Sequence, residues 1–209
     1  MRLKKRVRVG GLDLAAANSG MFIAEAVTRN GQPPLEITPI NAKALRTEMG
    51  DYTTRVKVSQ EIVDAMLKHK VDFVVIEDYA MRMGPNNTSG LQQAELVGMV
   101  KLRLHEAGVV FMTVNPSQMR SFIGLMQKDK KQVIIDNMAN RWGISSDAPR
   151  KADRSNIIDS AAHMIIGACV YFSSHGHLTS NLSERERRVL YGDDLKMQGL
   201  VNKLPKKDN

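Results

Sequence analysis

Three carboxylates, Asp13, Glu77 and Asp159, stand where a chain could use them to hold metal ions. Asp13 and Glu77 each end an apolar run, and Asp159 lies in a stretch that predicts an early helical turn. A charged side chain at the end of an apolar strand is costly to bury alone, so it usually has a partner or a metal ion. Two strand-end acids that face one helix acid can converge on Mg²⁺, which prefers oxygen ligands. A pair of such ions can activate water and stabilise the leaving oxygen in phosphodiester hydrolysis.

Each acid also has an ordinary structural explanation. Asp13 could be a turn residue, Glu77 could cap a helix or pair with a lysine, and Asp159 could be a routine helix-start residue. Asn156 lies three residues before Asp159 and shares its helical face. His163 lies one turn after Asp159 and could bind a metal, although packed or hydrogen-bonded histidines are more common. The order and spacing of the three acids together favour one site over three separate roles.

Composition limits the classes of protein to consider. The 209 residues are 43% hydrophobic, which is enough for one α/β domain with a substantial core. The net charge of +8 favours a polyanionic partner. The single cysteine, Cys169, allows neither a disulfide nor a thiolate metal site within the chain. The basic N-terminus leads into Gly10 rather than a long apolar run, and no run reaches membrane-spanning length, so we expect a cytoplasmic protein with no membrane partner.

Periodicity predicts a mixed sheet with helices on both faces. Three β-rich segments with short breaks favour an antiparallel meander. The next expected strand, 71–77, is continuously apolar, as in a sheet that is covered on both sides. The expected strands are 6–14, 19–28, 34–40, 71–77 and 109–114. The expected helices are 53–69 (capped by Thr53 or Thr54), 89–107, a short turn after Pro116, 133–142 and 155–172.

The glycine-containing stretch from Gly10 to Gly20 has two interpretations. Small residues let a phosphate or a second backbone come close. The stretch resembles the first strand of ribonuclease H-like nucleases, and it also resembles the phosphate loop of actin-like ATPases and sugar kinases. An actin-like fold needs two related lobes, and the sequence contains no second glycine-rich phosphate loop with Asp.

Taken together, short stretches in a fixed order resemble a RuvC-type Holliday-junction resolvase, a branch of the ribonuclease H-like superfamily. They are 11–13, 75–77 with the loop after it, 94–100, 131–133 and 156–161. The resemblance implies an α/β, ribonuclease H-like fold with a mixed five-stranded sheet and helices on both faces. It assigns residues 1–172 to the nuclease domain and leaves 173–209 outside, as a peripheral helix and basic tail.

The resemblance also implies an activity. The expected protein is a homodimeric, structure-selective endonuclease that resolves four-way DNA junctions by paired, metal-dependent nicks, in a bacterial cell or a phage-infected host. Asp13, Glu77 and Asp159 take the places of the family's catalytic acids, with a pair of Mg²⁺ ions per site and Mn²⁺ as a substitute. Asn156 stands where the family usually has a second Asp or a His, so its neutral amide would be the fourth metal ligand. A module that binds branched DNA without cutting is the remaining alternative.

Candidate DNA contacts come from the loop after Glu77 and from two basic segments. Aromatic and methionine side chains could wedge against bases or pack under the loop, and the basic residues could contact phosphates or remain solvated. The candidates are Tyr79, Met81, Lys128, Lys130, Lys131, Arg150, Lys151 and Arg154.

The helix expected at 89–107 is the candidate dimer interface. It carries an apolar stripe, with two small residues that permit close approach. A lone domain would more simply bury the stripe in its own core. The stripe is Leu91, Val97, Val100 and Leu104, and the small residues are Ala94 and Gly98.

Overall fold

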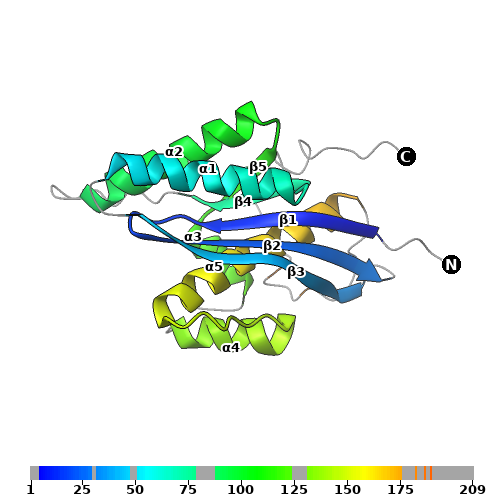
Figure 1. The fold of residues 1–209 in the computed structure, drawn as a ribbon. Coiled ribbons are helices and arrows are strands. Elements are labelled where there is room, and N and C mark those ends of the chain that lie inside the picture. The colour runs from blue at the N-terminus through cyan, green and yellow to red at the C-terminus, as the bar shows by residue number, and fades with distance from the viewer. Residues whose placement is uncertain are drawn as a thin grey trace.

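The computed structural model describes residues 5–29, 32–47, 51–78, 88–123 and 131–175, together with residues 182, 186 and 189. These residues form a five-stranded sheet in the order β3-β2-β1-β4-β5 (Figure 1). Strands β1, β2 and β3 are antiparallel neighbours, whereas β1, β4 and β5 run parallel. The predicted mixed sheet is therefore confirmed. Its strands are β1 (Lys5–Asp13), β2 (Asn18–Arg29), β3 (Gln32–Arg46), β4 (Phe73–Glu77) and β5 (Val110–Val114).

Helices cover both faces of the sheet, as predicted. One face packs against α1 (Tyr52–Lys68) and α2 (Thr88–Glu106), which lie together above the sheet in Figure 1. The other face packs against α5 (Lys151–Ser174), with α3 (Pro116–Phe122) and α4 (Lys131–Trp142) in the same hydrophobic cluster. The sheet therefore separates two hydrophobic cores.

Strand alternation decides which core each side chain joins. Val9 in β1 and Val75 in β4 belong to the core under α5, whereas Leu12 and Ile76 belong to the core under α1 and α2. Successive side chains of a strand point to opposite faces. The odd-numbered residues of both strands therefore face α5.

Helix α5 lies almost in backbone contact with the sheet. A Cβ atom on Gly11 would come within 1.9 Å of the Ser160 carbonyl oxygen, and one on Gly20 within 2.0 Å of the Asn156 carbonyl oxygen. Only glycine permits such an approach. The small residues of the 10–20 stretch thus admit a second backbone, which is the ribonuclease H-like interpretation and not the nucleotide-phosphate one.

Two element boundaries differ from the prediction by four residues or more. Helix α5 starts at Lys151, four residues before the expected Ser155, and β3 continues to Arg46 rather than ending near residue 40. The segment before Ser155 looks like a polar connection, but Asp153 in it is buried and paired with Arg46. Tertiary contacts override local propensity here.

The N-terminus of α1 also differs from the prediction. Its cap is Asp51, not Thr53 or Thr54: the Asp51 carboxylate accepts a hydrogen bond from the Thr53 backbone N–H at 2.8 Å. The Thr54 hydroxyl donates to the same carboxylate. An aspartate cap satisfies a backbone donor that the helix leaves free.

The apolar stripe predicted on α2 is not available to a partner. Val97, Val100 and Leu104 are buried in the core that α2 shares with α1 and the sheet, and only Leu91 is exposed, at 70%. The simpler alternative, burial in the chain's own core, is the one observed for three of the four residues.

Helix α5 is long and apolar enough to cross a membrane by length and composition alone. Within the described structure, however, 89% of its most apolar window is buried inside the protein. Cys169 lies on this helix and is buried, and burial raises the pKa of its thiol, as expected for an inert cysteine. The helix is the central element of the core under the sheet.

Candidate active site

The three predicted acids meet at one edge of the sheet, on the face that carries α5. β1 and β4 are parallel neighbours with Leu12 opposite Ile76, so Asp13 and Glu77 end adjacent strands at the same edge. Their odd numbers place both on the face that packs against α5, which carries Asp159. Because α5 begins at Lys151, Asp159 lies in its third turn and has no role at the helix start.

Asp159 is buried, Asp13 and Glu77 are half-buried, and the three carboxyl groups repel one another. Burial is the main cause that raises the pKa of Asp13 well above its ordinary value, and the charges of Glu77 and Asp159 add to the shift. Burial and the Asp159 charge raise the pKa of Glu77 to about 7. Burial also raises the pKa of Asp159. The fold therefore concentrates negative charge that its own cations do not fully compensate.

Two cations lie close enough to oppose these shifts. Lys131, at the start of α4, places its Nζ 3.9 Å from Asp159 Oδ2, and its charge lowers the pKa of all three acids relative to burial alone. Arg120 on α3 acts in the same direction on Glu77 and Asp159. Sequence reasoning missed Arg120. The signal available was its place on a short Pro-started helix directly after β5, whose end lies beside that of β4.

His163 lies directly beneath the acids. It is fully buried, its Nδ1 is 2.8 Å from the Asp159 carbonyl oxygen, and its Nε2 is 3.7 Å from Glu77 Oε2. Burial lowers the pKa of its imidazole to about 4. The structure thus places this histidine against two of the three acids.

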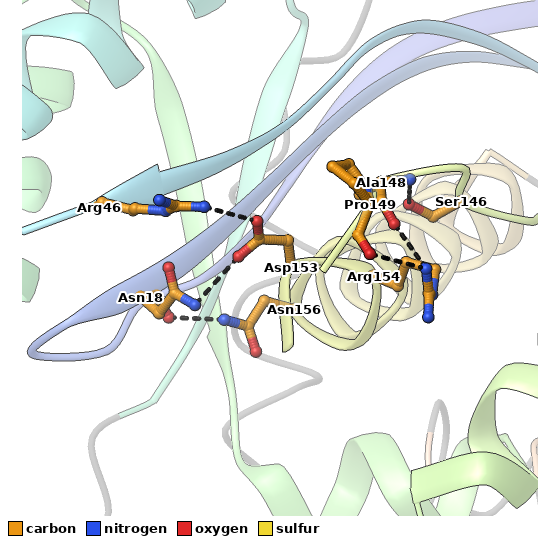
Figure 2. A network of polar contacts seen from close by, with 8 residues as sticks. All are labelled: Asn18, Arg46, Ser146, Ala148, Pro149, Asp153, Arg154 and Asn156. Atoms are coloured by element: carbon orange, nitrogen blue, oxygen red, sulfur yellow. Dashed lines mark hydrogen bonds and ion pairs between the residues drawn. The ribbon is translucent and has the colours of Figure 1, made fainter. Parts of the chain in front are cut away.

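Asn156 is held by a polar network at the N-terminal end of α5 (Figure 2). Its Nδ2 donates to the Asn18 carbonyl oxygen at 2.8 Å, and Figure 2 shows its Oδ1 pointing away from Asn18. The amide nitrogen is therefore committed to β2, which leaves the oxygen as the atom that can face a cation.

Asp153 belongs to the same network and is unlike the three acids. Its Oδ2 lies 2.9 Å from an Arg46 guanidinium nitrogen, and its Oδ1 accepts from Asn18 Nδ2 at 3.2 Å. Hydrogen bonding to Arg46 is the main cause that holds the pKa of Asp153 below its ordinary value. Its charge is compensated by the protein.

The predicted DNA-contacting residues fall into two groups. Lys131 borders the acids, Arg150 and Lys151 are exposed at the start of α5, and Arg154 donates to the carbonyl oxygens of Ala148 and Pro149 at 2.8 and 3.3 Å (Figure 2). Arg154 thus holds the segment before α5 against the first turn of that helix. The remaining candidates lie outside the described residues; they are Tyr79, Met81, Lys128 and Lys130.

The donor set fits a hard divalent cation. Asp159 Oδ1 is buried and has no hydrogen-bond partner within the described parts of the chain, although a buried acceptor normally has one. Carboxylate oxygens are the ligands that Mg²⁺ prefers. No three acidic, histidine or cysteine side chains among the described residues already stand at metal-binding distances. A bound cation would therefore have to draw these side chains together. Among the described residues, Asp159 Oδ1 makes no hydrogen bond that this movement would break.

Such an arrangement can support hydrolysis of a phosphate ester without a side-chain nucleophile. Three carboxylates can hold cations, and Lys131 can neutralise a phosphate that the acids would otherwise repel. The chain's positive charge suits a polyanionic substrate.

Comparisons with known proteins agree with this geometry. The family model described as crossover junction endodeoxyribonuclease RuvC matches residues 11–161. No curated protein matches the sequence. The fold is similar to that of Thermus thermophilus RuvC, with a TM-score of 0.62 and 13% identity over 82% of this chain and 98% of that one.

Two complexes have the same fold. Thermus thermophilus RuvC with a Holliday junction substrate matches with a TM-score of 0.61 and 15% identity, over 78% of this chain and 94% of that one. The Fowlpox virus resolvase with substrate Holliday junction DNA matches with a TM-score of 0.50 and 14% identity, over 76% of this chain and 95% of that one.

Proposed function

The chain belongs to the family of crossover junction endodeoxyribonucleases called RuvC, and from that premise we propose that Asp13, Glu77 and Asp159 carry its catalysis. The protein is a structure-selective DNA endonuclease that resolves four-way junctions by metal-dependent phosphodiester hydrolysis. The single observation that supports the site is the meeting of three mutually repelling carboxyl groups, one buried and two half-buried, at the ends of β1 and β4 and on α5. All three lie inside the region matched by the family model.

We propose a pair of Mg²⁺ ions per site, with Mn²⁺ as a substitute, held by the three acids and the Asn156 amide oxygen. When bound, the ions would supply the activation of water and the stabilisation of the leaving oxygen. Asp13 and Glu77 provide rigid anchors because each ends a strand of the sheet. The hydrogen bond from Asn156 to the Asn18 carbonyl orients the amide, so that its oxygen is the free donor atom.

The cations at the rim position the substrate. Lys131 is paired only loosely with Asp159, at 3.9 Å, and its side chain is 58% exposed, so it can also reach an incoming phosphate. Arg150 and Lys151 add exposed positive charge at the start of α5, the helix that carries Asp159. Phosphate contacts of this kind fix register on DNA without reading sequence. We propose that these residues align a junction strand over the acids.

A homodimer is part of the proposal, through the exposed face of α2, which keeps Leu91 and Gly98 of the predicted interface and adds Leu102. Leu91 and Leu102 are 70% and 58% exposed, and a Cβ atom on Gly98 between them would meet nothing within 4 Å among the described residues. Their spacing of seven and four residues places all three on one helical face. Two-fold pairing there would bring together two sites for paired nicks.

Sedimentation tests the dimer. Replacing Leu91 and Leu102 by Glu should give a monomer at micromolar concentration, because charge is depleted from interface centres. Leu67→Glu, at a 48% exposed position of α1, is the control and should leave the dimer intact. A wild-type chain that sediments as a monomer, alone and with a junction, would refute the dimer.

The two alternative functions are less well supported. Helix α5 occupies the space over Gly11 and Gly20 that a nucleotide phosphate would need in an actin-like ATPase. A binding-only module would not need three neighbouring acids whose charge the protein compensates only in part. We also propose an intracellular location, where chromosomal or phage junctions form.

The test is metal-dependent nicking of a synthetic four-way junction, with a linear duplex of the same sequence as the control. We expect nicks at symmetric positions in two opposing strands in Mg²⁺, none with EDTA, and little cutting of the duplex. Equal cutting of the duplex would refute structure selectivity, and cutting in EDTA would refute the metal-dependent mechanism.

A further inference from the structure

His163 presents an unusual nitrogen to the acidic site. The side chain is fully buried on α5, one helical turn after Asp159. Its Nδ1 lies 2.8 Å from the Asp159 carbonyl oxygen. A carbonyl oxygen only accepts hydrogen bonds, so Nδ1 must carry the proton, and in a neutral imidazole the lone pair is on Nε2. The backbone of α5 therefore fixes the tautomer.

No hydrogen-bond donor among the described residues contacts the lone pair of Nε2. Within the described parts of the chain, Nε2 is buried and makes no hydrogen bond, and the nearest charged group is Glu77 Oε2, at 3.7 Å. An ionised carboxylate is also an acceptor only. Two acceptors that face each other inside a protein repel unless a proton, a water molecule or a cation lies between them.

A purely structural role explains this arrangement poorly. A buried acceptor without a partner destabilises the folded protein. Neighbouring buried positions of α5 carry apolar residues such as Ala162 and Met164, and an apolar side chain at position 163 would avoid the cost. The imidazole instead turns its free nitrogen towards the acids.

We propose that His163 Nε2 is a nitrogen ligand to the divalent metal ion that Glu77 binds. The inference rests on the proposed function, since it requires the acids to hold metal. With this ligand, the metal ion at Glu77 would have both nitrogen and oxygen donors instead of oxygen donors alone. Imidazole favours first-row transition ions over Mg²⁺, which prefers oxygen ligands. The preference of this site for Mn²⁺ over Mg²⁺ should therefore be stronger than that of an all-carboxylate site.

The direct test uses the full-length wild-type chain, stripped of metal and loaded with Mn²⁺ alone. Pulsed electron paramagnetic resonance detects nitrogen nuclei bound to Mn²⁺, and it needs no variant to fold. We expect a coupling typical of imidazole nitrogen, which changes to the ¹⁵N pattern when the protein is labelled with ¹⁵N-histidine. No histidine coupling in Mn²⁺-loaded wild type would overturn the proposal.

Variants assign the coupling to one residue. His163→Leu and His163→Gln should lose it, and their ratio of Mg²⁺ to Mn²⁺ dissociation constants should fall by about tenfold. His105→Ala, at an exposed position of α2, is the matched control and should keep both the coupling and the ratio. A coupling that persists in both folded His163 variants would overturn the assignment. Tighter Mn²⁺ binding after the change to Leu would overturn it too, because it would identify an imidazolium that competes with the metal.

Junction nicking in Mg²⁺, measured on the same preparations, separates this inference from the proposed function. Wild type that nicks junctions but shows no imidazole coupling would refute only the nitrogen ligand. Wild type that shows the coupling but nicks no junction would support the ligand and refute the nuclease.

Discussion

Helix α5 carries two aspartates that the fold treats in opposite ways. Asp153, in the first turn, is held by Arg46 at 2.9 Å and Asn18 at 3.2 Å, and its pKa is lowered. Asp159, six residues later, is buried, has one oxygen without a described protein partner, and has a raised pKa. The Lys131 ammonium nitrogen is 3.9 Å from its Oδ2.

The difference separates a structural charge from a functional one. The Asp153 pair links the end of β3 and the start of β2 to α5, and so fixes the helix against the sheet. Asp159, with Asp13 and Glu77, forms a cluster whose charge the protein leaves largely uncompensated. Such a cluster is stable in its ionised form only when a cation from outside completes it.

The largest expected effect is on catalysis. Asp13→Asn, Glu77→Gln and Asp159→Asn should each reduce junction nicking in Mg²⁺ by about a hundredfold or more, because each removes metal-binding charge without removing volume. Junction binding measured by gel shift should persist. Asp153→Asn is the matched control on the same helix and should keep most of the activity. The comparison fails if Asp153→Asn abolishes nicking as fully as Asp159→Asn does.

The next effect concerns Asn156, which lies between the two aspartates. Asn156→Asp should keep activity and lower the Mg²⁺ concentration at half-maximal rate, because it adds charge to the metal site. The change also loses the hydrogen bond to the Asn18 carbonyl, at a cost of about 1 kcal/mol. Asn156→Leu should impair nicking. Identical Mg²⁺ titration curves for all three proteins would exclude Asn156 as a ligand.

A smaller effect is expected from the basic residues that the sequence predicts as DNA contacts. Replacing Lys130, Lys131 and Lys151 by Ala should weaken binding to all junction sequences alike, and each lost phosphate contact should reduce the log–log salt slope by about 0.9. The control is Lys68→Ala with Lys70→Ala. These two lysines are exposed, at the last residue of α1 and two residues beyond it. An unchanged slope in the triple variant would mean that the net charge acts elsewhere.

The sequence indicates the acids of the candidate site, but it does not indicate the structural role of Asp153. Asp13 and Glu77 end apolar runs, which predicts a strand end for each, and the parallel pairing of β1 with β4 brings both to one edge and one face. Asp153 carries no such signal, because the basic and polar residues around it are typical of a loop. The pair with Arg46, 107 positions away in the chain, leaves no local signal.

The remaining errors have the same origin. The apolar stripe on α2 looks the same in sequence whether it faces a partner or α1, and only the packing of the two helices decides between them. His163 and Arg120 reach the acids through the placement of α5 and α3 on the sheet, which no spacing rule gives. Local patterns therefore located the acids, whereas their surroundings depend on tertiary contacts.

The two kinds of acid also predict opposite dependences of stability on pH. Glu77 has its pKa raised from about 4.5 to about 7, so the folded, metal-free protein binds this proton more tightly than the unfolded chain does. Its free energy of unfolding should therefore fall as the pH rises through that range. The contribution of Asp153 has the opposite sign: it is present above about pH 4 and is lost as the acid is protonated.

Thermal unfolding of wild type, Asp159→Asn and Asp153→Asn at pH 8, in EDTA and in Mg²⁺, tests the central claim most directly. In EDTA, Asp159→Asn should melt above wild type, because it removes a buried repulsive charge, and Asp153→Asn should melt below it. Each 1 kcal/mol corresponds to roughly 2–4 °C for a chain of this size. Mg²⁺ should raise the melting temperature of wild type and Asp153→Asn but hardly that of Asp159→Asn. If Asp159→Asn melted below wild type in EDTA and gained as much as wild type from Mg²⁺, Asp159 would be an ordinary structural acid and the account would be contradicted.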